Sequence, residues 1–174
     1  MLAAVLSACE TPPEPAPAPP EDPPRAMEAS RIDVVDLRRD GDLPFIEGRL
    51  DPTPAAAAAV ALRDRFVASG APGGVVFAIE TARVRAAPVA ASDSIAGVVG
   101  TRHDGLIRLR GTRQPPNGPT SEALIEATRR LDVPESFGPL QREQALNAFV
   151  ADMVADLLRE TEARLDEDGG WFSR

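Results

Sequence analysis

Apolar residues recur at two spacings along the chain, and both begin only at Arg31. Short β-branched runs bounded by Gly, Pro or Asp predict strands, and we expect these at 31–38, 45–50, 75–85, 94–101 and 106–112. Apolar residues three and four positions apart predict helices, and we expect these at 54–69, 121–131 and 138–166. The predicted order of elements is therefore β-β-α-β-β-β-α-α.

The turns between the predicted strands indicate hairpins instead of regular βαβ units. Asp40-Gly41 follows the first strand, and His103-Asp104-Gly105 separates the last two. Asp-Gly pairs favour tight turns between antiparallel strands. Such connections imply a mainly antiparallel sheet with the helices packed on one face. The predicted fold class is α+β.

The chain divides into four segments by composition. Residues 1–8 are apolar, and residues 9–30 hold eight prolines interleaved with Ala, Glu and Asp. A segment of the second kind cannot bury apolar surface, and it favours an extended polyproline II spacer. We expect one folded domain at 31–168, and the diglycine at its end predicts a flexible tail at 169–174.

The apolar start of the chain runs directly into its only cysteine. Leu6-Ser7-Ala8-Cys9 resembles the lipobox of bacterial lipoproteins, in which Leu and two small residues precede an invariant Cys. The resemblance implies cleavage before Cys9, a diacylglycerol thioether on its sulfur, and an acyl chain such as palmitate on its new amino group. The alternative is a frayed apolar terminus with a chance cysteine.

Two details next to the lipobox refine this expectation. No basic residue precedes the apolar run, which is compatible with a natural start upstream of Met1. In the sorting rule of lipoproteins from two-membrane bacteria, an Asp after the Cys favours the inner membrane. Glu10 stands there instead, so the resemblance favours the outer membrane.

Charge and composition exclude several classes of protein. The 174 residues include 19 basic residues, all of them Arg, and 27 acidic ones, for a net charge of −8. Without lysine there is no P-loop lysine and no Schiff base, and a single histidine excludes an HExxH zinc pair. An acidic chain is a poor match for nucleic acid. We expect no metal and no cofactor apart from the covalent lipid.

The basic residues are concentrated in one stretch of predicted strands. Residues 81–118 hold six arginines and two acids, and alternation places Arg83 with Arg85, and Arg108 with Arg110, on single strand faces. Four guanidinium groups could bind phosphate or carboxylate in bidentate fashion, which would suit an anionic lipid, a glycan or an acidic partner. The alternative is a solvated face paired to the acidic helices of the same domain.

Two further groups carry candidate chemistry. His103 could act as a general base, but no GxSxG nucleophile elbow accompanies it, and a polar residue is expected in a turn. Trp171 and Phe172 follow the diglycine, and two large aromatic residues there are either tucked against the domain or exposed as an anchor for a partner.

These patterns favour a non-enzymatic lipoprotein that serves as an accessory or scaffold in a bacterial envelope transport or assembly complex. The element order and the opening of the last helix, Arg142-Glu143 and Ala145-Leu146, are also loosely similar to auxiliary lipoproteins of envelope transport systems. The expected partners are a membrane, held through the lipid on the periplasmic side, and an envelope protein. The alternatives are a periplasmic binding module for an anionic envelope lipid or glycan and, less favoured, a hydrolase that uses His103.

Overall fold

The computed structural model describes residues 23–38, 46–90 and 98–173. Their elements, in chain order, are β1 (Arg25–Met27), β2 (Arg31–Asp36), the 3-10 turn η1 (Glu47–Arg49), α1 (Pro54–Arg65), β3 (Phe66–Ala68), β4 (Gly74–Ala90), β5 (Val98–Gln114), β6 (Ser121–Pro134) and α2 (Pro139–Asp168).

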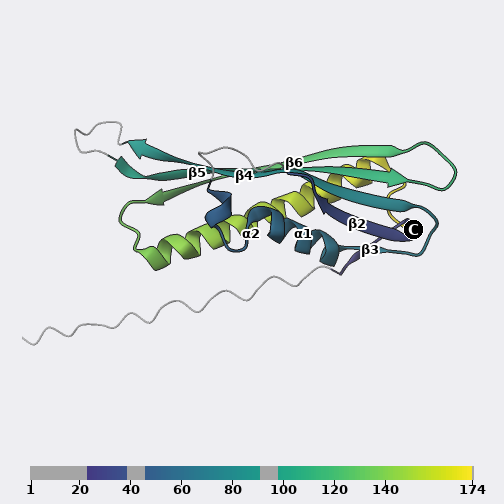
Figure 1. Cartoon of the computed structure of the whole chain (residues 1–174), viewed down its shortest axis with the longest axis horizontal. Helices are drawn as coiled ribbons and strands as arrows, with labels where there is room; N and C mark the ends of the chain where they lie inside the picture. The colour runs from purple at the N-terminus through teal and green to yellow at the C-terminus, as the bar shows by residue number, and fades with distance from the viewer. Residues whose placement is uncertain (1–22, 39–45, 91–97, 174) are drawn as a thin grey trace, which may run out of the picture.

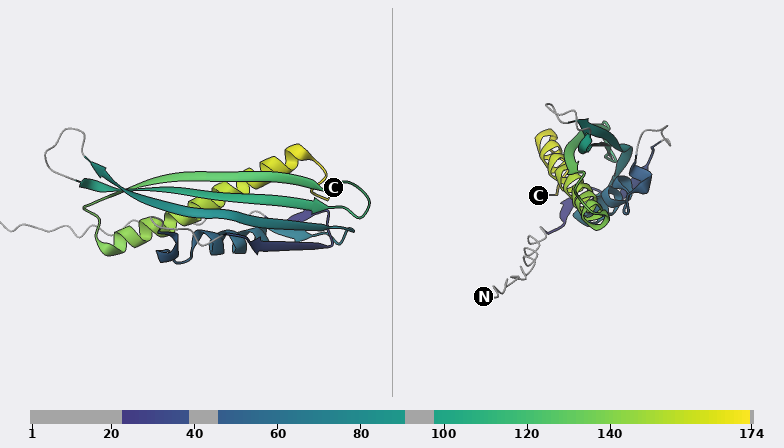
Figure 2. Two further views of the ribbon diagram at one scale, coloured as in Figure 1. Left: turned by 45° about the horizontal axis from the view of Figure 1, so that its top comes forward. Right: turned by 90° about the vertical axis from the view of Figure 1, so that its left-hand side faces the viewer.

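The main sheet has four strands in the order β2-β4-β5-β6. β4, β5 and β6 form an antiparallel meander, whereas β2 pairs with β4 in parallel. Both helices lie on one side of this sheet, and the end-on view shows the sheet curling around that side (Figures 1 and 2). The α+β class and the placement of the helices on one face are therefore confirmed.

Alternation along the long strands explains why one face of the sheet is apolar. Inward-facing residues such as Phe77, Val84, Ile107 and Leu109 are completely buried. α2 closes this face with a stripe at helical spacing that runs from Phe149 to Leu165. The other face carries mainly charged side chains and is open to solvent.

Local sequence determines where the two helices begin. The Thr53 hydroxyl accepts a hydrogen bond from the Ala56 amide, and Pro54 occupies the first turn, where its missing N–H is not needed. α2 begins at Pro139 and ends at Asp168, and the φ of 67° at the following residue, Gly169, favours glycine. The expected helices at 54–69 and 138–166 are present, although α1 ends four residues early, where Phe66 enters β3.

The helix expected at 121–131 is wrong, because this segment is the strand β6. Leu124, Ala127 and Leu131 fit a helical stripe, but Ala123, Ile125 and Ala127 fit a strand equally well. Pairing with β5 along its whole length decides between the two spacings. Leu124 consequently faces solvent instead of the core.

The hairpin expected at His103-Asp104-Gly105 is also wrong, because β5 runs straight through it. Gly105 lies where α2 crosses the strand. A Cβ at this position would come within 2.7 Å of Met153 Cε and 2.8 Å of Phe149 Cζ. This glycine therefore permits the close approach of the helix and does not form a turn.

Smaller differences concern the ends of the domain and one early strand. The strand expected at 45–50 is wrong over its described part, which contains η1. Structure begins before residue 31, because β1 pairs in parallel with β3. The predicted turn at 40–41 and residues 91–97, which include the start of the strand expected at 94–101, lie outside the described residues.

Candidate functional surfaces

The outer face of the sheet carries cross-strand ion pairs that we call the charged ladder. Its pairs are Arg102 with Asp132 (2.8 Å), Arg130 with Asp104 (2.8 Å), Arg108 with Glu126 (2.6 Å), and Arg110 with Glu80 (2.7 Å) and Glu122 (3.4 Å). The first three join residues that are directly opposite each other on β5 and β6. Such pairs favour the observed strand register.

A bulge in β4 provides the carboxylate for Arg110. The register between β4 and β5 shifts between Ile79 and Thr81, which leaves Glu80 as an extra residue. The hydrogen bond from Arg110 to Glu80 is the main cause of the raised pKa of this guanidinium group. At the other end of the ladder, the hydrogen bond from Arg102 lowers the pKa of Asp132. These acids occupy positions at which an external anion would bind.

All four arginines predicted as an anion site lie on this outer face. Arg83 is opposite Leu106 and Arg85 is opposite Asp104 in the pairing of β4 with β5, and both side chains are exposed. Arg108 and Arg110 are ion-paired. Their partners lie on neighbouring strands, not on the acidic helices that the sequence suggested. The arrangement favours a solvated, internally paired face.

His103 lies beneath α2 and not in an exposed turn, with 6% of its surface accessible. It borders a cleft of about 230 Å³ between β5, β6 and the start of α2, which is also lined by Glu135 and Arg142. Burial lowers the pKa of His103, and the carbonyls of Thr101 and Leu131 offset only part of that effect. Its Nδ1 atom is buried and has no hydrogen-bond partner among the described residues. The structure thus places this histidine in the core.

The C-terminal aromatic residues pack against the domain, as in the tucked alternative. The flexible tail expected at 169–174 is therefore wrong over its described part, residues 169–173. Trp171 is 1% exposed, and its carbonyl accepts a hydrogen bond from the Glu28 amide at 2.8 Å. Phe172 forms a bridge with Met27, and the guanidinium carbon of Arg25 lies 3.7 Å from the centre of its ring. These contacts make the C-terminus part of the fold beside β1.

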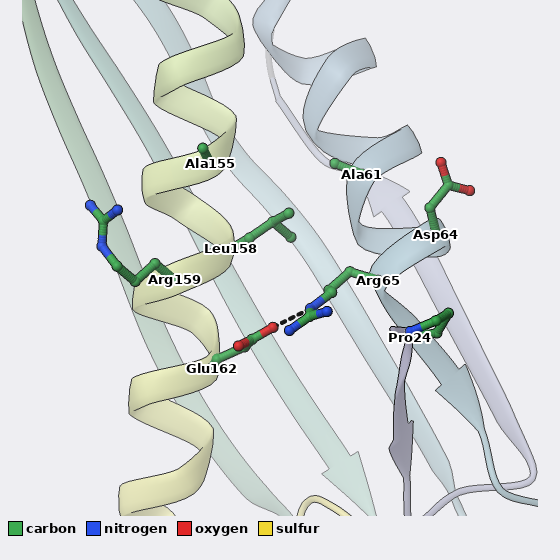
Figure 3. Close-up of a pocket in the computed structure, with 8 residues that line it drawn as sticks. All are labelled: Pro24, Ala61, Asp64, Arg65, Ala155, Leu158, Arg159 and Glu162. Carbon is green, nitrogen blue, oxygen red and sulfur yellow. Dashed lines mark hydrogen bonds and ion pairs between the residues drawn. The ribbon is translucent and has the colours of Figure 1, made fainter. Parts of the chain in front are cut away.

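A groove of about 540 Å³ runs between α1 and α2 (Figure 3). Its apolar lining comes from Ala61 on α1 and from Ala155 and Leu158 on α2, and Pro24 closes one end. Two of these side chains are alanines, which project little from the helices and leave space between them. The sequence analysis did not identify this groove, because its walls lie about 90 residues apart in the chain.

Ion pairs fix the N-terminal segment at one end of this groove. Arg65 pairs with Glu162 across the two helices, and its Nη1 donates to the Pro23 carbonyl at 2.7 Å. Arg25 makes two hydrogen bonds to Asp166 on α2, at 3.0 and 2.9 Å. The hydrogen bond from Arg25 is the main cause of the lowered pKa of Asp166. The chain therefore enters the domain at a defined place.

Within the described residues, no helix is long and apolar enough to cross a membrane. The same part of the chain contains no group of three or more His, Cys, Asp or Glu side chains that could hold a metal ion. Cys9 and the rest of the lipobox lie outside the described residues.

Comparison with known proteins gives matches among solved structures. No protein-family model and no curated protein sequence matches the chain. Rare lipoprotein B from Shewanella oneidensis is 8% identical, with a TM-score of 0.46 over 79% of this chain and 96% of that one. A minor lipoprotein from Acinetobacter baumannii is 9% identical, with a TM-score of 0.38 over 83% of this chain and 97% of that one.

A third similar structure is a hypothetical protein from Chlamydia trachomatis, which is 11% identical with a TM-score of 0.33 over 71% of this chain and 93% of that one. The first two proteins are lipoproteins by name. Because all three TM-scores are below 0.5, these similarities decide neither the fold nor the function of this chain.

Proposed function

We propose that this chain is a membrane-anchored lipoprotein whose domain acts as a non-enzymatic accessory or scaffold in a bacterial envelope transport or assembly complex. The observation that carries the proposal is the order of features along the chain. The lipobox Leu6-Ser7-Ala8-Cys9 is followed by an acidic, proline-rich stretch, and the folded domain begins immediately after it.

The physical chemistry of anchoring supports this order. Each buried methylene contributes about 0.8 kcal/mol, and stable attachment needs two or more chains. A diacylglycerol thioether on Cys9 would supply them. From Cys9 to Pro23 the backbone advances by 14 residues, which as polyproline II would extend to about 43 Å. Such a spacer would let the domain reach a partner in the periplasm while the lipid stays in the membrane.

The surfaces of the domain support an accessory role over a catalytic one. His103, the residue on which a hydrolase hypothesis depends, is buried beneath α2 with its pKa lowered by that burial. The charged ladder pairs Arg108 and Arg110 with acids of the same sheet, which weakens the alternative of an anionic lipid or glycan site. The domain retains an open charged face, and we propose an envelope protein as its partner.

We also propose that the lipid inserts in the outer membrane, with the domain in the periplasm. Glu10 supports this assignment, because the residue after the lipidated Cys is the sorting position in the lipoprotein resemblance. Separation of inner and outer membranes by density tests it. Recovery of the chain with the inner membrane would contradict it.

Membrane attachment is tested by expressing the chain with its natural upstream region in a two-membrane bacterium. We expect Cys9→Ser to move the protein from the membrane to the soluble fraction, because serine provides no thiol for the thioether. Ser7→Ala is the matched control, since a small residue at that position keeps the lipobox pattern. Equal membrane retention of the parent and Cys9→Ser would contradict the anchor.

The accessory role needs a separate test. We expect in-cell crosslinking of the anchored chain to capture an envelope protein, and the purified domain to bind that same protein again in a pull-down. If none of the crosslinked proteins binds the purified domain, the scaffold part of the proposal is wrong even where the lipid anchor is present.

A further inference from the structure

The strand β6 ends the main sheet on one side. It pairs with β5 along its length, and Figure 1 shows it at the margin of the sheet. In an antiparallel pair, every second residue directs its N–H and C=O groups away from the neighbouring strand. In the part of the chain that the structure describes, residues 121–133 form no backbone–backbone hydrogen bond outside their pairing with β5. This margin of the sheet therefore presents a row of backbone donors and acceptors.

The edge lacks the features that usually prevent strands from pairing. Natural sheets protect their edges with prolines, bulges or very short strands. β6 contains no proline or glycine before Pro134, and its pairing with β5 shows no register shift. At the opposite margin, β2 has six residues, and its Val34 carbonyl accepts a hydrogen bond from Arg63 of α1. β6 is therefore the edge at which a further strand can be added.

We propose that β6 pairs in antiparallel fashion with β6 of a second copy of this chain, about a two-fold axis at Thr128. The two four-stranded sheets then form one continuous sheet. Main-chain hydrogen bonds between the copies supply the affinity, as in other cases of strand addition. The two-fold axis makes the interface self-complementary, so it closes as a dimer instead of a fibre.

Charges on the outer face select this register. Residues directly opposite each other share a face of the sheet, so one strand can slide only by two residues at a time. With Thr128 at the axis, Glu126 lies opposite Arg130 of the other copy, twice by symmetry. A slide by two residues places Asp132 opposite Glu122 in one direction and opposite Glu126 in the other. A slide by four residues places Glu126 or Arg130 opposite its own counterpart. Each of these alternatives pairs like charges, which destabilises a sheet.

Glu126 and Arg130 can form the new pair without losing their present partners. Arg108 donates to Oε2 of Glu126, and Arg130 donates to Asp104 through Nε at 2.8 Å. Among the described residues, Oε1 of Glu126 and both Nη atoms of Arg130 have no hydrogen-bond partner. The Arg130 side chain is 65% exposed and the Glu126 side chain 45%. Positive and negative groups then alternate across the four strands nearest the axis.

The inner face of β6 suits the same register. Ile125 lies opposite Leu131 of the other copy, and Leu131 is only half-buried within one domain. Two apolar side chains opposite each other stabilise a strand pair. Arg129 also points inward, but it already pairs with Asp152 at 2.6 Å and Asp156 at 2.8 Å on its own α2. No unpaired charge therefore enters the contact between the copies.

The mass of the protein in solution is the first test. The sample is the full 174-residue chain with Cys9→Ser, which carries no lipid and no thiol. We expect light scattering to give a mass that rises with concentration from 18.4 kDa toward twice that value. A mass that stays at 18.4 kDa up to about 1 mM, where even weak complexes form, would overturn the proposal.

A disulfide at the axis tests which surface forms the dimer. Cβ atoms directly opposite each other in an antiparallel pair are about 4.5–5.5 Å apart, close to the span of a disulfide. We expect most chains of Thr128→Cys, added to Cys9→Ser, to become disulfide-linked dimers under mild oxidation. Leu124→Cys is the matched control, because Leu124 is 56% exposed on the same face of the same strand.

In the proposed register, two copies of residue 124 are about 27 Å apart, at about 3.4 Å per residue. We therefore expect few linked dimers of Leu124→Cys. Equal linkage of the two variants would overturn the pairing at β6, because it would describe chance collision or a dimer formed through another surface.

Reversal of charge tests the register. Glu126→Arg alone and Arg130→Glu alone each place like charges opposite each other twice, and each should raise the dimer dissociation constant about tenfold. The double variant restores opposite charges between the copies and should return the constant to within about threefold of the parent. Glu122→Arg is the control, because it faces Pro134 of the other copy and should leave the constant unchanged.

The double variant separates effects between the copies from effects within one copy. It carries two conflicts with Arg108 and Asp104 inside each domain, whereas each single variant carries one. A double variant that dimerises no better than the single variants would therefore overturn the register. Because every sample lacks lipid, failure of these tests is distinct from failure of the lipid anchor, which membrane fractionation measures.

Discussion

Replacement of Trp171 by alanine tests whether the C-terminus is part of the core. The side chain is 1% exposed and lies against β5, with its Cη2 atom 3.6 Å from the position of a Cβ on Gly111. Removal of a fully buried Trp costs about 3–5 kcal/mol in the free energy of unfolding. Domains of this size have about 5–15 kcal/mol in total, so we expect Trp171→Ala to remove about a fifth of it or more.

The assay is urea unfolding followed by far-ultraviolet circular dichroism, since Trp171 is the only tryptophan and its fluorescence is lost in the variant. Leu124→Ala is the control, because Leu124 is 56% exposed on the outer face of β6. We expect a change within about 0.5 kcal/mol for this surface substitution. The parent provides a second readout, in which acrylamide should quench the buried indole slowly.

Two results together would refute the reasoning. The first is a free energy of unfolding for Trp171→Ala within about 0.5 kcal/mol of the parent, the range of a surface substitution. The second is quenching of the parent as efficient as that of free tryptophan. They would show that the aromatic tail is exposed and free to anchor a partner.

Three further predictions concern the sheet. Gly105→Ala should lower the free energy of unfolding in urea by about 1–3 kcal/mol, because its Cβ would meet Met153 and Phe149. Gly111→Ala is the control and should be tolerated, because its Cβ would meet neighbours at 3.4 Å or more. Equal losses for the two variants would contradict the close approach of α2. Burial lowers the pKa of His103, so the unfolded chain takes up a proton at this residue first as pH falls. The contribution of neutral His103 to the free energy of unfolding is therefore complete above about pH 6.5. Below that pH it is lost by at most about 1.4 kcal/mol per pH unit. In unfolding measurements at about pH 7.5 and about pH 5.5, His103→Gln should lose this part of the dependence, and an unchanged slope would place His103 in solvent. The double variant Arg108→Ala with Arg110→Ala should shift the unfolding midpoint little, because surface ion pairs contribute little to stability. It should also leave binding to anionic vesicles unchanged. A clear loss of vesicle binding would instead support the anion site.

Local patterns predicted the parts of the fold that depend on local physics. α1 has its N-cap at Thr53 and Pro54 in its first turn, and the apolar stripe of α2 continues for several turns. Each signal lies within a few residues of the structure that it specifies. β2 and β4 were likewise predicted from β-branched runs that can be buried only in a sheet.

The errors arise where a local pattern fits two structures. The spacing in 121–131 fits both a helix and a strand, and only the long pairing with β5 selects the strand. Gly105 after Asp104 has the composition of a turn, but its role comes from α2, more than 40 residues later in the chain. Neither contact can be predicted from neighbouring residues.

The candidate surfaces show the same limit. Alternation predicted that Arg108 and Arg110 share a face, but their partners Glu126 and Glu80 follow from strand register and from a bulge. The groove between α1 and α2 depends on two helices that meet only in the folded chain. The lipobox differs, because a processing signal is read as sequence and does not depend on a fold.

The intact mass of the membrane-extracted protein tests the central claim most directly. The chain would be expressed with its natural upstream region in a two-membrane bacterium, extracted in detergent and measured by mass spectrometry. The account predicts a polypeptide that begins at Cys9 and carries the added mass of a diacylglyceryl group and an acyl chain. An unmodified polypeptide that retains Met1 and the residues before Cys9 would contradict it.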